Sequence, residues 1–150
     1  MLLKDVCTTG VVVCGAHISA IEAARLMRHS HVGDLVVVDD PRDERTPLGV
    51  ITDRDLVVEV LGNGLDPAKT TVGSLLHTPV VIAQESEDTG QVIERMRAHG
   101  VRRVPVVDQN GAAVGIITLD DVMRLIVADA NALLEIMAKA QRHEQQSRRQ

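Results

Sequence analysis

Apolar residues along the chain form short continuous runs typical of strands and stretches with the spacing of a helix. The same order of runs and helical stretches occurs twice. Short β-branched runs at 11–13 and 80–82 predict strands. Each run precedes apolar residues at helical spacing, which are Ile21, Ala24 and Met27 in the first half and Val92, Ile93 and Met96 in the second. Further β-branched runs at 35–38 and 104–107 predict buried strands. Ser19 in the first half, and Ser86 or Asp88 in the second, are expected to cap the helices.

A shift of 69 residues, which carries Met27 onto Met96, superposes the two halves. The polar and apolar positions then coincide, and the shift pairs Thr9 with Thr78, Val11 with Val80, Val32 with Val101 and Asp39 with Asp108. Internal repetition of this length predicts two copies of one structural unit. Each copy is expected to run strand, helix, strand, strand, helix.

Each copy carries a closely similar motif where its last strand is expected to lead into its last helix. The two motifs are Gly49-Val50-Ile51-Thr52-Asp53-Arg54-Asp55 and Gly115-Ile116-Ile117-Thr118-Leu119-Asp120-Asp121. A β-branched strand runs into a threonine that can cap the following helix, and an aspartate follows three residues later. The hydroxyl could contact a phosphate or sugar oxygen, and the carboxylate could accept hydrogen bonds from vicinal hydroxyls. Alternatively, both aspartates only complement the positive end of the helix dipole.

Glycine and proline residues that interrupt secondary structure, together with the spacing of the apolar residues, divide the chain into four segments. We expect a first repeat at 1–62, a linker at 63–71, a second repeat at 72–128 and a C-terminal extension at 129–150. The last helix is expected to run well beyond the second repeat, because no glycine or proline occurs from Asp120 to Gln141. Its apolar stripe consists of Val122, Ile126, Ala130, Leu133, Leu134 and Met137. Part of this helix is expected to pack on another subunit, and the polar end to fray.

Composition excludes several classes of partner. The 150 residues include no Phe, Tyr or Trp, so the core must be aliphatic and no aromatic platform for single-stranded nucleic acid exists. The net charge of −5 gives no general attraction to phosphate backbones or anionic membranes. We therefore expect neither nucleic acid nor membrane as a partner. The apolar runs are too short for a signal peptide or a transmembrane helix, which predicts a cytoplasmic protein.

No residues point to a metal site or to catalysis. Cys7 and Cys14 have neither zinc-site nor redox-motif spacing and are expected to be reduced and buried. His29 and His31 lack an evident third ligand. The adjacent carboxylates Asp39 and Asp40 lack the facing geometry that acid–base chemistry requires.

Two motifs of the second copy resemble those of the cystathionine-β-synthase (CBS) domain. They are Arg102-Arg103-Val104-Pro105-Val106-Val107-Asp108 and Gly115 to Asp121, and the resemblance covers about residues 7–125. Two copies in tandem resemble a CBS pair, or Bateman module, of a stand-alone bacterial protein. The first copy departs from the pattern: Val36 replaces Pro105, Gly33-Asp34 replaces Arg102-Arg103, and the following turn is longer. The implied fold is α/β, with two pseudo-twofold-related βαββα repeats, an extended C-terminal helix and dimerisation through helices into a flat disc.

The resemblance implies a regulatory module that binds adenosine-containing ligands in clefts between the repeats. In such modules the Asp of Thr-x-x-Asp holds the ribose hydroxyls and the Thr lies near the ribose or phosphates. Carried over to this chain, the first cleft, here called the Arg-rich cleft, comprises Thr52, Arg54, Asp55, Thr78, Val80, Val101, Arg102 and Arg103. The second, the Asp-rich cleft, comprises Thr9, Val11, Val32, Gly33, Asp34, Thr118, Asp120 and Asp121.

The two clefts are expected to differ in charge. Three arginines suit phosphate contacts in the first, whereas carboxylates predominate in the second. We therefore expect the Arg-rich cleft to bind a nucleotide phosphate tightly, and the Asp-rich cleft to be empty or to take an uncharged or cationic ligand. AMP, ADP, ATP, S-adenosylmethionine and a dinucleotide are all candidate effectors, with no catalytic cofactor.

The resemblance favours a sensor without catalytic activity that acts on a protein partner in trans. Two other functions are compatible with the sequence. One is an interaction scaffold whose clefts no longer bind ligand, and the other is a nucleotide-processing enzyme. The identity of the ligand and of the partner, and a parallel or antiparallel dimer, are alternatives that the sequence leaves open.

Overall fold

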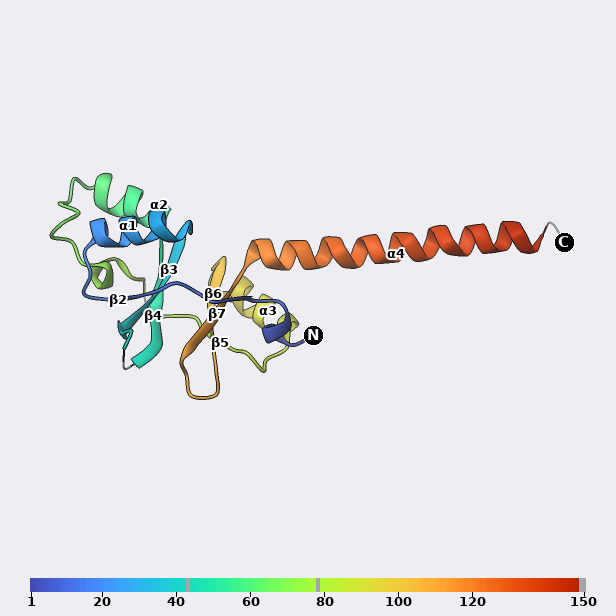
Figure 1. Ribbon diagram of the computed structural model, residues 1–150, viewed down its shortest axis with the longest axis horizontal. Coiled ribbons are helices and arrows are strands. Elements are labelled where there is room, and N and C mark those ends of the chain that lie inside the picture. The colour runs from blue at the N-terminus through green and yellow to red at the C-terminus, as the bar shows by residue number, and fades with distance from the viewer. Residues whose placement is uncertain (43, 78, 149–150) are drawn as a thin grey trace.

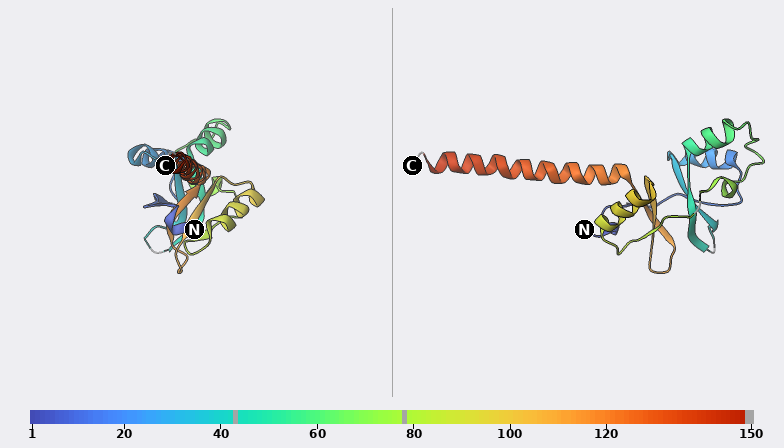
Figure 2. Two further views of the ribbon diagram at one scale, coloured as in Figure 1. Left: turned by 90° about the vertical axis from the view of Figure 1, so that its right-hand side faces the viewer. Right: turned by 180° about the vertical axis from the view of Figure 1, so that it is seen from behind.

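Two sheets, each covered by helices of its own repeat, form the body of the protein (Figure 1). The computed structural model describes residues 1–42, 44–77 and 79–148. One sheet has three strands in the order β2-β3-β4, and the other has four in the order β1-β7-β6-β5. The long C-terminal helix projects away from both, as the view from behind also shows (Figure 2).

The first repeat forms the three-stranded sheet and two helical segments. Strand β2 (Val13–Gly15) leads into helix α1 (Ala20–Ser30), which Ser19 caps as predicted. Strands β3 (Asp34–Asp40) and β4 (Glu44–Thr52) pair antiparallel, and β2 pairs parallel to β3. The second helix is short at α2 (Asp53–Asp55) and continues as the π-helical segment η2 (Leu56–Leu61).

The second repeat has the same order of elements, which confirms the predicted βαββα unit. Its elements are β5 (Ala83–Gln84), α3 (Thr89–His99), β6 (Arg103–Val107), β7 (Ala113–Thr118) and α4 (Leu119–Ser147). Of the two predicted caps for α3, Asp88 accepts a hydrogen bond from the Gly90 N–H at 2.9 Å. The first strand of each repeat begins later than the apolar run predicts, since β2 starts at Val13 and β5 at Ala83.

The two repeats exchange their leading segments. The 3₁₀ turn η1 (Leu3–Asp5) and strand β1 (Thr8–Thr9) pack on the second repeat, where β1 pairs antiparallel with β7. The 3₁₀ turn η3 (Val72–Leu75) packs on the first repeat, where the Val72 N–H donates to the Ile18 carbonyl at 2.9 Å. Leu3 and Val72 occupy equivalent repeat positions, and both are fully buried in the core of the other repeat. The exchange therefore ties the repeats into one body.

A third apolar cluster joins the two sheets. Val36 and Val38 of β3 pack with Ala113 and Ile116 of β7. Val11 packs against the same cluster, which explains why it lies between the sheets rather than in a strand. All three clusters are built from aliphatic, methionine and cysteine side chains, as the absence of aromatic residues requires.

Helix α4 begins in the body and then leaves it. Val122 is its buried residue, whereas every residue from Ile126 to Arg148 is exposed. Its 29 residues correspond to a length of about 44 Å. No helix within the described ranges combines the length and the apolar character needed to cross a membrane.

Candidate nucleotide site at the strand-to-helix junctions

Thr52 and Asp55 form a reciprocal cap where β4 ends and α2 begins. The Asp55 N–H donates to Thr52 Oγ1 at 3.1 Å, and the Thr52 N–H donates to Asp55 Oδ2 at 2.9 Å. This capping box satisfies two backbone donors that a helix start leaves without partners. It also fixes the orientation in which the carboxylate presents its other oxygen, Oδ1.

Thr118 and Asp121 repeat this arrangement where β7 runs into α4. The Asp121 N–H donates to Thr118 Oγ1 at 3.2 Å, and the Thr118 N–H donates to Asp121 Oδ2 at 2.9 Å. The Thr118 hydroxyl also donates to Asp121 Oδ2 at 2.8 Å. The Asp121 side chain is 12% exposed, and its Oδ1 lies 3.9 Å from Arg124 Nη1. The predicted threonine caps are therefore confirmed, and both aspartates have a structural role.

An ion pair connects the two repeats between these junctions. Arg103 Nε donates to Asp34 Oδ2 at 2.8 Å. Asp34 lies opposite Thr52 in the β3–β4 ladder, and Arg103 lies opposite Thr118 in the β6–β7 ladder. The two strand ends thus face one another across a pair of opposite charges. Arg103 belongs to the predicted Arg-rich cleft and Asp34 to the predicted Asp-rich cleft, so the ion pair lies at the boundary between the two predicted clefts.

The remaining residues of the Arg-rich cleft have different surroundings. Arg54 is exposed on α2, and Val80 is half-buried ahead of β5. Val101 and Arg102 line a groove between α3 and α4 of their own repeat, where the Arg102 carbonyl accepts from the Leu119 N–H at 2.9 Å. Thr78 lies outside the described residues. The hydrogen bonds and the groove lining place Thr52 with Asp55 and Val101 with Arg102, whereas Arg103 contacts Asp34 of the other predicted cleft.

The residues assigned to the Asp-rich cleft lie in several surroundings. Thr9 is exposed and pairs with Gly115 of β7, the strand that ends at Thr118. Val11 packs between the sheets, and Val32 packs against the core of the first repeat. The Gly33 carbonyl accepts from the Asp53 N–H at 3.0 Å, and Asp120 is exposed. The N-terminal segment thus lies on the strand that carries the second Thr-x-x-Asp motif.

Cys7 lies near the second junction and is half-buried, although the sequence predicts a buried cysteine, whereas Cys14 is buried as predicted. Its Sγ is 3.1 Å from the point where a Cβ on Gly115 would lie. Burial raises the pKa of the Cys7 thiol, and the carboxylate of Asp121 adds to this rise. Leu76 has the equivalent position over Gly49. The repeat alignment relates Cys7 to Leu76 and is the signal that could have indicated both positions. Both cysteines are free thiols.

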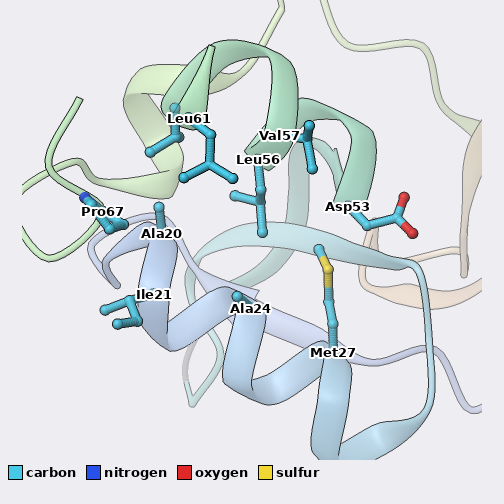
Figure 3. Close-up of a pocket in the computed structure, with 10 residues that line it drawn as sticks. Ala20, Ile21, Ala24, Met27, Asp53, Leu56, Val57, Leu61 and Pro67 are labelled. Atoms are coloured by element: carbon cyan, nitrogen blue, oxygen red, sulfur yellow. The ribbon is translucent and has the colours of Figure 1, made fainter. Parts of the chain in front are cut away.

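Two apolar grooves lie on the helices. The first, here called the α1–η2 groove, has a volume of about 390 Å³, and Figure 3 shows Met27 and Leu56 pointing into it, with Asp53 at one end. The groove between α3 and α4 is its counterpart in the second repeat, with a volume of about 350 Å³. Within the described ranges no group of three His, Cys, Asp or Glu residues is placed to hold a metal ion.

Comparison with known proteins identifies both repeats. The family model of the CBS domain matches residues 3–62 and 72–128. The chain is 35% identical over 107 residues to an uncharacterized protein of Methanopyrus kandleri, covering 71% of this chain and 53% of the relative, so it spans about half the length of that relative. It is 35% identical over 121 residues to hypoxic response protein 1 of Mycobacterium tuberculosis, covering 81% of this chain and 82% of the relative.

A solved structure shows the same arrangement of repeats. It is the CBS domain pair of protein MJ0100 in complex with 5′-methylthioadenosine and S-adenosyl-L-methionine, with a TM-score of 0.73 and 28% identity. The match covers 86% of this chain and 98% of that chain. The two family matches and the exchanged, pseudo-twofold-related βαββα repeats together show that this chain belongs to the CBS domain family and forms a tandem CBS pair.

Proposed function

We propose that this protein is a non-catalytic regulatory module that binds an adenosine-containing ligand between its repeats and signals to a protein partner in the cytoplasm. The effector is a nucleotide such as AMP, ADP or ATP, an S-adenosyl compound, or a dinucleotide. The observation that carries the proposal is the matched pair of Thr-x-x-Asp capping boxes. Each box holds Oδ2 of its carboxylate in hydrogen bonds, and Oδ1, which for Asp121 lies 3.9 Å from Arg124 Nη1, would accept hydrogen bonds from ribose hydroxyls.

Charge near the first junction supports a ligand that carries phosphate. Arg54 is exposed directly beside Asp55, and Arg103 belongs to an ion pair at the boundary of the two repeats. Arginine is suited to bidentate phosphate contacts. Binding of 5′-methylthioadenosine and S-adenosylmethionine by a CBS pair of similar fold supports an adenosine ligand.

The exchanged segments suggest how ligand occupancy would be transmitted. Each Thr-x-x-Asp motif ends a strand of one repeat, and the second motif ends the strand on which β1 of the first repeat lies. A ligand between the repeats would favour the relative placement that binds it better, because only differential affinity shifts such an equilibrium. The helical grooves would carry a homodimer through the helices, and the partner protein would respond to the altered assembly.

An ultraviolet spectrum of the freshly purified protein tests the proposal. The chain has no Trp, Tyr or Phe, so it is almost transparent in the adenine absorption band. We expect a band that acid precipitation of the protein releases into solution, and mass spectrometry of the released compound would name the ligand. If the spectrum is flat, the protein is titrated with AMP, ATP and S-adenosylmethionine. The absence of detectable binding in all three titrations would contradict the proposal.

A protein-interaction scaffold with non-binding clefts is the second candidate. The observation that favours it is the apolar surface of the α1–η2 groove and of α4. A scaffold would keep its partner complexes with and without nucleotide. It would lose those complexes when the exposed apolar residues of α4 are replaced by polar ones.

A further inference from the structure

Helix α4 carries a row of exposed apolar side chains after it has left the body. Met123, Ile126, Leu133 and Met137 are between 51% and 63% exposed. Together with Ala130 and Ala140 they recur at alternating spacings of three and four residues. This spacing is the pattern of a two-stranded coiled coil, in which such a stripe faces a partner helix. Val127 and Leu134 flank the stripe and are 54% and 61% exposed.

A second copy of the same helix fits this stripe by charge. The first part of α4 carries Asp120, Asp121, Asp129 and Glu135 against Arg124, whereas the last part carries Lys139 and Arg142 against Glu144, and Arg148 follows directly after the helix. Parallel pairing would place the acidic part of one helix against the acidic part of the other. Antiparallel pairing places acidic against basic and brings Asp120 of one copy near Arg142 of the other. Charge therefore favours the antiparallel orientation.

Side-chain size points to the same orientation. In a parallel pair Ala130 would face Ala130 and Ala140 would face Ala140, which leaves two poorly filled layers. In an antiparallel pair centred between residues 131 and 132, Met123 faces Ala140, Ile126 faces Met137 and Ala130 faces Leu133. Every layer of this register is apolar and none pairs two alanines. We propose that α4 forms an antiparallel coiled coil with α4 of a second copy, in this register, with the two bodies at opposite ends.

The apolar layers of the proposed contact use no residue assigned to the two clefts or lining the helical grooves, so the contact can form beside a dimer through those grooves. Of its charged residues, Asp120 and Asp121 also belong to the predicted Asp-rich cleft. Contacts at both surfaces on different partners would build assemblies larger than a dimer. The total size of the assembly is therefore a poor test, and a test must report on α4 itself.

Cysteine cross-linking in the full-length protein tests the orientation and the register. Ile126→Cys and Met137→Cys are made separately, each with its own tag, and are then expressed alone or together and oxidised. Both positions are exposed, so neither change disturbs the core. We expect a disulfide-linked heterodimer when the two variants are co-expressed. Neither variant alone should cross-link above wild type, which also controls for Cys7 and Cys14.

A second pair of variants controls for random collisions. Ala128→Cys and Glu135→Cys match the same register but lie on the outer face of the helix, so their co-expression should give no heterodimer. Efficient cross-linking of Ile126→Cys with itself would show a parallel pair and overturn the proposal. The proposal would also be overturned if Ile126→Cys and Met137→Cys did not cross-link at all. Equal cross-linking of Ala128→Cys with Glu135→Cys would overturn it as well.

Discussion

Asp34 and Arg103 occupy the same position in the two repeats and contact each other, with Arg103 Nε 2.8 Å from Asp34 Oδ2. Each is the first residue of its strand, β3 or β6. In a pair of identical repeats this contact would bring two like charges together across the pseudo-twofold axis, which is unfavourable. Opposite charges at this position instead stabilise the association of the repeats. The pair also connects the ends of both ladders, since Asp34 faces Thr52 and Arg103 faces Thr118.

Releasing Arg103 from Asp34 is expected to strengthen phosphate binding. In Asp34→Asn the guanidinium keeps its charge but loses its carboxylate partner. The affinity for AMP should rise by up to about fivefold, because partly exposed ion pairs are worth up to about 1 kcal/mol. Calorimetric titration with AMP measures the change. Adenosine is the control ligand: if its affinity rises as much as that of AMP, the effect does not arise from a phosphate contact.

The two Thr-x-x-Asp motifs are expected to contribute unequally to nucleotide binding. Asp55→Ala should lower the affinity for a phosphate-bearing nucleotide by at least about tenfold, because hydrogen bonds to a charged group are lost beside the exposed Arg54. Asp121→Ala should lower it less. Both variants also lose a capping interaction of about 1 kcal/mol, so thermal unfolding of each serves as the control for folding. Equal losses of affinity would contradict the predicted asymmetry.

Gly49 and Gly115 are equivalent residues whose replacement by alanine should have unequal costs. A Cβ on Gly115 would lie 2.8 Å from the Thr8 carbonyl oxygen, so β1 would have to move away from β7. We expect Gly115→Ala to lower the free energy of unfolding by about 1–3 kcal/mol. A Cβ on Gly49 would meet the end of the Leu76 side chain at 3.0 Å, which can rotate away. Urea denaturation compares the two variants, and an equal loss would be evidence against the exchanged N-terminal strand.

Glu87 is expected to make stability depend on pH in the acid range. A hydrogen bond from Arg95, above all, lowers the pKa of Glu87, and the backbone N–H of Gln84 contributes. A carboxyl whose pKa is lowered by folding adds stability above its unfolded pKa, and this stability is lost as the pH falls through the folded value. Glu87→Gln should therefore show a smaller loss of stability between about pH 5 and pH 3 than wild type. Parallel pH profiles of the two melting temperatures would contradict this role.

The repeat and its junctions could be predicted from the sequence because they rest on local chemistry. A β-branched run followed by Thr and, three residues later, Asp determines the strand end and its cap within a few residues, and both capping boxes are present. The starts of β2 and β5 could not be placed in this way. Val11 is as β-prone as Val13, but packing between the two sheets keeps it out of the ladder.

The contacts between the repeats could not be predicted from local sequence patterns. Leu3 and Val72 occupy equivalent positions in short apolar stretches, and the local sequence does not indicate that each is buried in the other repeat. For the same reason the sequence divided Asp34 and Arg103 between two clefts, although the structure pairs them. Their equivalence was visible in the alignment, but their proximity follows from the symmetry axis. The composition of both clefts remains a prediction for ligand-binding experiments.

The measurement that tests the central claim most directly is equilibrium dialysis of ligand-free protein against AMP, ATP and S-adenosylmethionine in turn, with ligand measured by its absorbance. The aromatic-free chain contributes almost nothing to that signal. A double variant, Asp55→Ala with Asp121→Ala, is measured beside the wild type. We predict that wild type retains an excess of at least one ligand and that the folded double variant retains none. An equal excess on both proteins, or no excess of any ligand on wild type, would contradict the assignment of the Thr-x-x-Asp junctions as an adenosine-ligand site.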